Sequence, residues 1–176
     1  FFRVSEAEKP LKIYFFTRTA EDTYTVSAMV EGNGTAIYRV DYVDLNGSGC
    51  KEVVVSWQMS TGVYLLGAYS LEEAMVRSLQ YAASAPAGSA SAQGLPDREA
   101  LRATEWMTTV YDNYALYDLD QDTRTELAVV RVDKAGTNSA VDLYGWRDGS
   151  FMVRASAPLS MGISSVEKNG VETNFL

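Results

Sequence analysis

The sequence predicts an all-β protein built from repeated units of about four antiparallel strands, and three observations support this. Eleven Tyr and three Trp residues are set among many Val, Ile and Thr residues, a composition typical of strands. A segment of roughly 75 residues occurs twice. Turn signals such as Asp148-Gly149 separate short apolar runs. A chain of 176 residues is also long enough to bury one core without disulfides.

The repeat is defined by three matches that occur in the same order in both copies. Residues 42–46 match 116–120 at an offset of 74, residues 63–67 match 141–145 at an offset of 78, and residues 75–77 match 152–154 at an offset of 77. Small drifts between matches are normal where turns differ in length. The sequence therefore predicts two structurally equivalent units.

Each unit is expected to alternate strands and turns. In the second copy, strands are predicted at 114–119, 126–132, 141–146 and 151–155, the last two joined by a tight Asp-Gly hairpin. In the first copy, residues 69–78 have a helical spacing of Leu71, Met75 and Leu79. The repeat nevertheless favours a hairpin there, and a hairpin is the prediction.

The expected organisation follows from the repeat. It comprises the end of a preceding unit at 1–34, a first unit at 35–81, a linker or insertion at 82–109, a second unit at 110–156 and the start of a following unit at 157–176. The 1–34 segment is expected to form a hairpin with strands at 11–17 and 24–30. Within the linker, residues 82–94 are rich in Ala, Ser and Gly, as in a loop, and 97–107 favours a short helix.

Composition excludes several classes of function. The net charge is −8, and the 15 Lys and Arg residues do not cluster, so no nucleic-acid surface is expected. No apolar run approaches the ~18–20 residues of a membrane span. The absence of His removes Ser-His-Asp and Cys-His catalysis, and the single Cys50 excludes an internal disulfide. The chain begins at Phe1 without a leader, so we expect a piece of a longer protein, with any lipid anchor outside it.

Two acidic loops are the strongest candidate sites. Both place oxygen-bearing side chains at loop positions 1, 3, 5 and 9 and a backbone carbonyl at position 7. The residues are Asp118, Asp120, Asp122, Glu126 and the Arg124 carbonyl in the second loop, and Asp44, Asn46, Ser48, Glu52 and the Cys50 carbonyl in the first. Calcium binds six to eight oxygens, which such a loop can direct inward. Calcium is predicted chiefly at the second loop, which carries four formal charges against two in the first.

An EF-hand does not fit these loops, because position 12 is Val129 or Val55 instead of glutamate. The pattern instead resembles the calcium loop of FG-GAP/VCBS-type repeats, found in integrin-like β-propellers. The 148–151 and 157–159 segments also resemble repeat-containing lipoproteins of Gram-positive gut bacteria. The loops depart from that family: Thr123 stands where it has glycine, and the first loop keeps Gly49 but has Asn46 and Ser48 in its middle.

The resemblance implies propeller-type blades, here an incomplete propeller of about two blades with partial ends. It also implies a secreted or cell-surface location and a binding role. The alternative for the loops is that they are polar turns whose side chains cap their own backbone, without metal.

Other residues are weaker candidates for a functional site. Ser165 and Lys168 have S-x-x-K spacing, but the partner motifs of that chemistry are missing. Cys50 next to Lys51 is expected to be an incidental surface thiol. Aromatic residues suit either a core or a carbohydrate-stacking platform, with a core favoured. These are Trp57, Tyr64, Tyr69, Trp106 and Trp146.

The predicted function is therefore a non-enzymatic extracytoplasmic interaction module with calcium-stabilised loops, whose partner is an unknown protein or glycan. A carbohydrate-binding accessory part of a surface glycan-processing enzyme is the first alternative. A hydrolase that uses paired carboxylates is the second.

Overall fold

The computed structural model describes residues 10–20, 22–84, 100–159, 164–168 and 171–175. These residues are mostly β-strand in antiparallel arrangement, with one helix. They divide into two compact units, the first comprising 1–44 and 48–108 and the second 45–47 and 109–176. Within the described part, no helix combines the length and the apolar character needed to cross a membrane.

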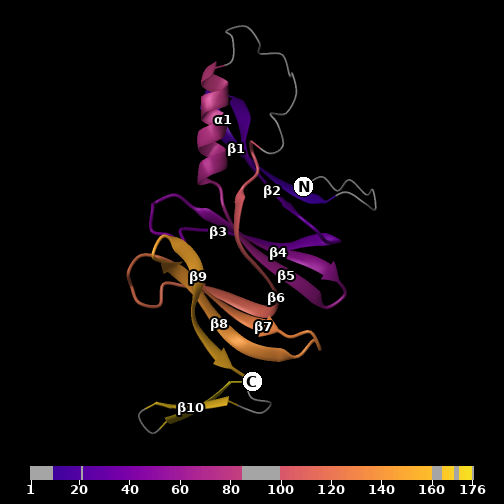
Figure 1. Cartoon of the computed structure of the whole chain (residues 1–176), viewed down its shortest axis with the longest axis vertical. Coiled ribbons are helices and arrows are strands. Elements are labelled where there is room, and N and C mark those ends of the chain that lie inside the picture. The colour runs from indigo at the N-terminus through magenta and orange to yellow at the C-terminus, as the bar shows by residue number, and fades with distance from the viewer. Residues whose placement is uncertain (1–9, 21, 85–99, 160–163, 169–170, 176) are drawn as a thin grey trace. The chain divides into compact units, whose positions relative to one another are not determined.

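The first unit contains five strands, a helix and the start of a sixth strand (Figure 1). Its elements are β1 (Leu11–Ala20), β2 (Thr23–Gly32), β3 (Ala36–Val43), β4 (Glu52–Ser60), β5 (Val63–Ser70), α1 (Glu72–Ser84) and the beginning of β6 (Thr104–Tyr117). β1 and β2 form the predicted antiparallel hairpin. β3, β4 and β5 form an antiparallel meander in which each strand pairs with the next.

The core of the first unit is built by β2, one face of β4 and β5, and the helix. Its buried apolar residues are Ala28, Val30, Val53, Val55, Trp57, Tyr69, Leu71, Ala74 and Ala103. The Trp57 indole N–H donates a hydrogen bond of 3.2 Å to the Tyr69 hydroxyl. Burial raises the pKa of Tyr69 above its ordinary value of 10.0, so this hydroxyl stays protonated at neutral pH. A Cβ on Gly32 would lie 2.3 Å from the Trp57 ring, so only glycine leaves room for the indole.

Helix α1 corrects the hairpin predicted at 69–78. Leu71 and Ala74 are each 1% exposed and Ser78 is 7% exposed, a spacing of three and four residues that gives one buried helical face. This face packs on β2, and its apolar residues join the core. The helical spacing in this segment was therefore the correct signal, and the match to the second copy was misleading.

The predicted linker is also corrected where the structure describes it. Residues 82–84 are the last turn of α1 instead of a loop, while 85–94 lie outside the described residues. No short helix forms over the described part of 97–107. Residues 101–103 run alongside β2, through hydrogen bonds from Met29 N to Leu101 O at 2.7 Å and from Ala103 N to Met29 O at 2.8 Å. Strand β6 then begins at Thr104.

The second unit contains the rest of β6 and three further strands, and each of these four strands pairs antiparallel with the next. The three further strands are β7 (Glu126–Val132), β8 (Asn138–Arg147) and β9 (Ser150–Pro158), followed by a separate hairpin of β10 (Ser164–Lys168) and β11 (Val171–Phe175). All four strands predicted for this copy are present. The Asp-Gly turn is as predicted, because Arg147 pairs with Ser150 and both central residues have positive φ angles of 50° and 80°.

The two units share one hairpin plan. In the β3–β4 hairpin Val43 pairs with Glu52, and in the β6–β7 hairpin Tyr117 pairs with Glu126, each residue 74 positions further on. The register shift in each pair also falls at corresponding places, 37–39 in β3 and 111–113 in β6. The first sequence match is therefore a true structural correspondence, including its β-bulge.

The other two matches are wrong. Val53 pairs with Tyr69 and Leu127 with Tyr144, so β5 corresponds to β8 at an offset of 75 instead of 78. Residues 75–77 lie in α1, whereas 152–154 lie in β9. The first unit consequently has a three-stranded meander followed by a helix, in place of the predicted four strands. Neither unit on its own forms a closed ring of strands in its described part.

Candidate functional site

The two acidic loops have the same backbone conformation. Each joins its strands with eight residues, and positive φ angles occur at loop positions 4 and 6 of both. These angles are 74° at Gly47 and 82° at Gly49 in the first loop, and 60° at Gln121 and 74° at Thr123 in the second. The second loop thus holds two non-glycine residues in a region that favours glycine.

The aspartate at position 1 organises each loop. The Asp118 carboxylate accepts hydrogen bonds from the backbone N–H of Asp122 and of Thr123, both at 3.1 Å. In the first loop, Asp44 Oδ2 accepts from Gly49 N at 2.9 Å, the same position-6 donor. These bonds are the ones expected if the loops are polar turns in which the side chain caps its own backbone, which is the alternative that involves no metal.

The residue at position 5 caps position 7 in both loops. Asp122 Oδ1 accepts from Arg124 N at 2.9 Å, and Ser48 Oγ accepts from Cys50 N at 3.2 Å. Asp122 Oδ2 lies 3.9 Å from Arg124 Nη1. The Asp122 carboxylate is therefore directed to Arg124, two residues further along the loop.

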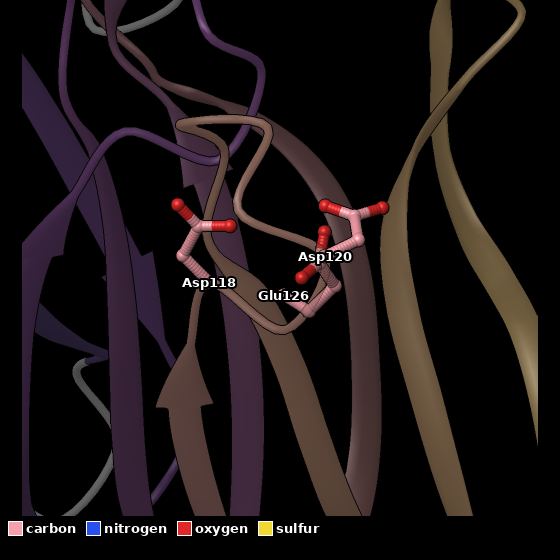
Figure 2. Close-up of side chains that lie close together, drawn as sticks. All are labelled: Asp118, Asp120 and Glu126. Carbon is pink, nitrogen blue, oxygen red and sulfur yellow. The ribbon is translucent and has the colours of Figure 1, made fainter.

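The second loop brings three carboxylates together. Oxygen atoms of Asp118, Asp120 and Glu126 lie within 4.8 Å of one another, and Figure 2 shows the Glu126 carboxylate between the other two in that view. Within the described residues this is the only such group of three or more His, Cys, Asp or Glu side chains. Such a group could hold a metal ion. Asp122 is not part of it.

The first loop gives no comparable group in the described part of the chain. Its two acids are Asp44 and Glu52, and the side chains between them are Asn46 and Ser48. Glu52 is 1% exposed, as buried as its counterpart in the second loop. Cys50 is an exposed thiol outside any disulfide.

Glu126 joins the loop to the sheet. Its side chain is 2% exposed, and its Oε2 accepts a hydrogen bond from Leu119 N at 2.8 Å. Its other oxygen, Oε1, lies 3.4 Å from Arg154 Nη1. Arg154 Nη1 also lies 3.4 Å from Asp120 Oδ2, so one guanidinium bridges two members of the acidic group.

Sequence reasoning missed Arg154 as a site residue. It lies in β9, in the register shift between β8 and β9, where Leu143 pairs with Ala155 but Tyr144 pairs with Val153. A Cβ on Gly145 would lie 2.6 Å from Arg154 Cδ, so this glycine makes room for the arginine stem. A lone glycine inside a strand is itself a signal of a bulge or a close approach.

The strain at Thr123 leads to a testable prediction. Replacing Thr123 by Gly should raise the free energy of unfolding by roughly 0.5–1 kcal/mol, because the left-handed strain removed exceeds the extra entropy of glycine in the unfolded chain. Urea denaturation in EDTA would measure it. The reciprocal change, Gly49→Thr, tests the same position in the first loop, where a Cβ meets nothing within 4 Å. It should cost about 1–2 kcal/mol. A Thr123→Gly protein less stable than wild type would contradict the assignment of strain.

Comparison with protein-family models, with curated proteins and with solved structures finds no match for this chain.

Proposed function

We propose that the chain is a non-enzymatic interaction module of an extracytoplasmic protein, in which calcium stabilises the second acidic loop. In this proposal its meanders are propeller-type blade elements of the FG-GAP/VCBS kind. The observation that carries the metal proposal is the group of three carboxylates on a loop whose backbone fold occurs twice. The repeated hairpin register supports the proposal of blade elements.

The residues present fit a divalent cation. The group carries three formal negative charges, on Asp118, Asp120 and Glu126, and Arg154 offsets only one of them. Each carboxylate oxygen can accept more than one bond, so the backbone donors of the loop do not exhaust the oxygens of Asp118 or Glu126. Calcium prefers such hard oxygen ligands. In the proposal these three side chains hold the ion.

Calcium is expected to raise the melting temperature of the wild-type protein relative to EDTA. At a hundredfold excess over its dissociation constant the ion would add about 2.7 kcal/mol to the free energy of unfolding. The Asp120→Asn change should remove most of that increase. Asn46→Ala, at the matching position of the first loop, should leave it intact. Identical wild-type melting curves in EDTA and in millimolar calcium would contradict the calcium proposal and would mean that the loops are polar turns without metal.

Arg154 provides a second arm of the same experiment. Its guanidinium lies where an ion would interact with Asp120 and Glu126. Arg154→Met should lower the melting temperature in EDTA, because the carboxylates lose their only described cationic partner. The rise caused by calcium should become larger than in wild type. A smaller rise would show that Arg154 does not compete with the ion.

A further inference from the structure

The leucine at position 2 of each acidic loop has different surroundings in the two copies. Leu45 in the first loop is 0% exposed, whereas Leu119, which lies 74 residues further on, is 55% exposed. Both loops have positive φ angles at positions 4 and 6 and the same hydrogen bond to the first aspartate, so local backbone shape does not explain the difference. A single exposed leucine is ordinary on a protein surface, but one whose counterpart is fully buried points to a neighbour that only the first copy has.

The first loop shows what such a neighbour is. Its tip, Leu45–Gly47, belongs to the second compact unit, although Asp44 and Ser48 on either side belong to the first. Gly47 lies close to the Arg124 side chain, because a Cβ on this glycine would be 2.9 Å from both Cγ and Nε of the arginine. Arg124 is position 7 of the second loop. The tip of one acidic loop therefore lies against position 7 of the next one.

The chain carries both halves of a second contact of this kind. One half is the tip of the second loop, where Leu119 and Gln121 are exposed at loop positions 2 and 4. The other half is the side of the first loop, where Cys50 at position 7 and the adjacent Lys51 are exposed. On that side, a Cβ on Gly49 would meet nothing within 4 Å. A single copy of the chain therefore presents a tip and an accepting side at the same time.

The two halves have complementary charges. The tip of the second loop is acidic, and the side chains of Asp120 and Asp122 are 45% and 38% exposed. The accepting side of the first loop carries the exposed Lys51. The existing contact also places a cationic side chain, Arg124, against the tip that it receives. Opposite charges at the two halves favour their association and fix its direction.

We propose that the partner of the second loop is a second copy of this chain, bound head to tail. Leu119 and Gln121 of one copy pack at Cys50 and Lys51 of the next, as the first loop tip does on the second loop. Such a contact joins two different surfaces, so it can extend from copy to copy. The inference rests on the repeated unit of the proposed function and names its partner, but it does not depend on calcium.

The test is cross-linking in EDTA with a short bismaleimide, which joins two thiols. A Gln121→Cys chain has one thiol at the second loop tip and the native Cys50 on the accepting side. It should give covalent dimers and longer ladders on denaturing gels, in which mass spectrometry finds the introduced thiol of one chain joined to Cys50 of another. Adding Leu119→Asp should lower the dimer yield about tenfold, because it places a charge where the contact buries apolar surface.

Two matched controls exclude random collision. Asp148→Cys places a thiol at a side chain that is 84% exposed, also in the second unit, and should give only background dimers. Leu79→Asp changes a leucine that is likewise 55% exposed, and it should leave the yield of the Gln121→Cys chain unchanged. Equal yields from Gln121→Cys and Asp148→Cys, links confined within one chain, or a yield that Leu119→Asp does not lower would overturn the proposal.

Sedimentation velocity of the protein without an added thiol decides the case in which Gln121→Cys fails to fold. The average mass of the wild type should rise with concentration, and Leu119→Asp should stay monomeric. A wild-type protein that is monomeric at millimolar concentration would exclude a second copy as the occupant and leave a similar unit of another chain. Because all samples contain EDTA, the outcome is independent of the calcium prediction, whose readout is the melting temperature.

Discussion

Replacing Trp57 by alanine is expected to lower the free energy of unfolding of the first unit by about 3–5 kcal/mol. The indole is fully buried and makes a hydrogen bond to Tyr69. Gly32 lies against the ring so closely that the surrounding backbone is shaped to it. Truncation would leave a large cavity that this packing cannot fill by collapse, and it would remove the hydrogen-bond partner of Tyr69.

Urea denaturation followed by far-UV circular dichroism would measure this loss without relying on tryptophan emission. Trp146→Ala is the matched control, because its indole lies in the second unit and is only half-buried. It should cost clearly less. Gly32→Ala should also destabilise the first unit, since its new methyl group would meet the ring. A Trp57→Ala loss below about 1 kcal/mol would mean that this residue is not central to the core.

The second large effect is expected from Arg131→Met in the second unit. Asp142 is 4% exposed, and its carboxylate accepts hydrogen bonds from Arg131 Nε at 2.6 Å and from Ser156 Oγ at 2.5 Å. Removing the arginine leaves a buried charge without its counter-ion, which costs about 3–5 kcal/mol in buried pairs. The Arg131 side chain is 41% exposed, so the lower end of that range is expected.

A double variant tests whether the buried charge is the cause. Arg131→Met combined with Asp142→Leu removes both partners, and it should be more stable than Arg131→Met alone. Arg39→Met, which breaks the surface pair between Arg39 Nη2 and Asp41 Oδ1 at 2.9 Å, is the control. It should change stability by less than about 1 kcal/mol. Equal losses for Arg131→Met and Arg39→Met in urea denaturation would contradict the prediction.

Much of the β structure could be predicted because its signals are local. Strand β7 has the bounds predicted for it, 126–132, around the apolar residues 127–130, and the Asp148-Gly149 turn follows from two residues that tolerate positive φ. The correspondence between the β3–β4 and β6–β7 hairpins, at an offset of 74, could be predicted because the loop and both flanking strands match.

Helix α1 was not predicted, because the repeat was extended to residues 75–77, which do not correspond to 152–154 in the structure. A match of only three residues, 75–77 with 152–154, was given more weight than the helical spacing of Leu71 and Met75. What decides the structure of this segment is the apolar surface of β2, which α1 covers, and that surface is distant in sequence. The register of β5 on β4 is set by its own turn, so the residues of β5 that correspond to those of β8 could not be identified from a sequence match alone.

The residues of the candidate site that lie in the loop or start the next strand could be predicted, but its contact with a residue distant in sequence could not. Asp118, Asp120 and Glu126 could be chosen from their spacing, and the structure brings them together. Asp122 was also chosen, but its carboxylate caps Arg124 N instead. Arg154 reaches the group from 28 residues beyond Glu126, through a bulge that no local pattern specifies.

The paired loops also indicate how further copies of this unit could be found in related chains. One loop uses glycine at both left-handed positions, and the other uses Gln121 and Thr123, yet both have the same backbone shape. A search that requires glycine would therefore miss the second loop. The shared features are an aspartate whose oxygen accepts from the residue five positions on, an oxygen-bearing side chain at the fifth position and a buried glutamate that starts the next strand. A query built on those three positions, with a bulge six residues before the aspartate, describes both copies equally well.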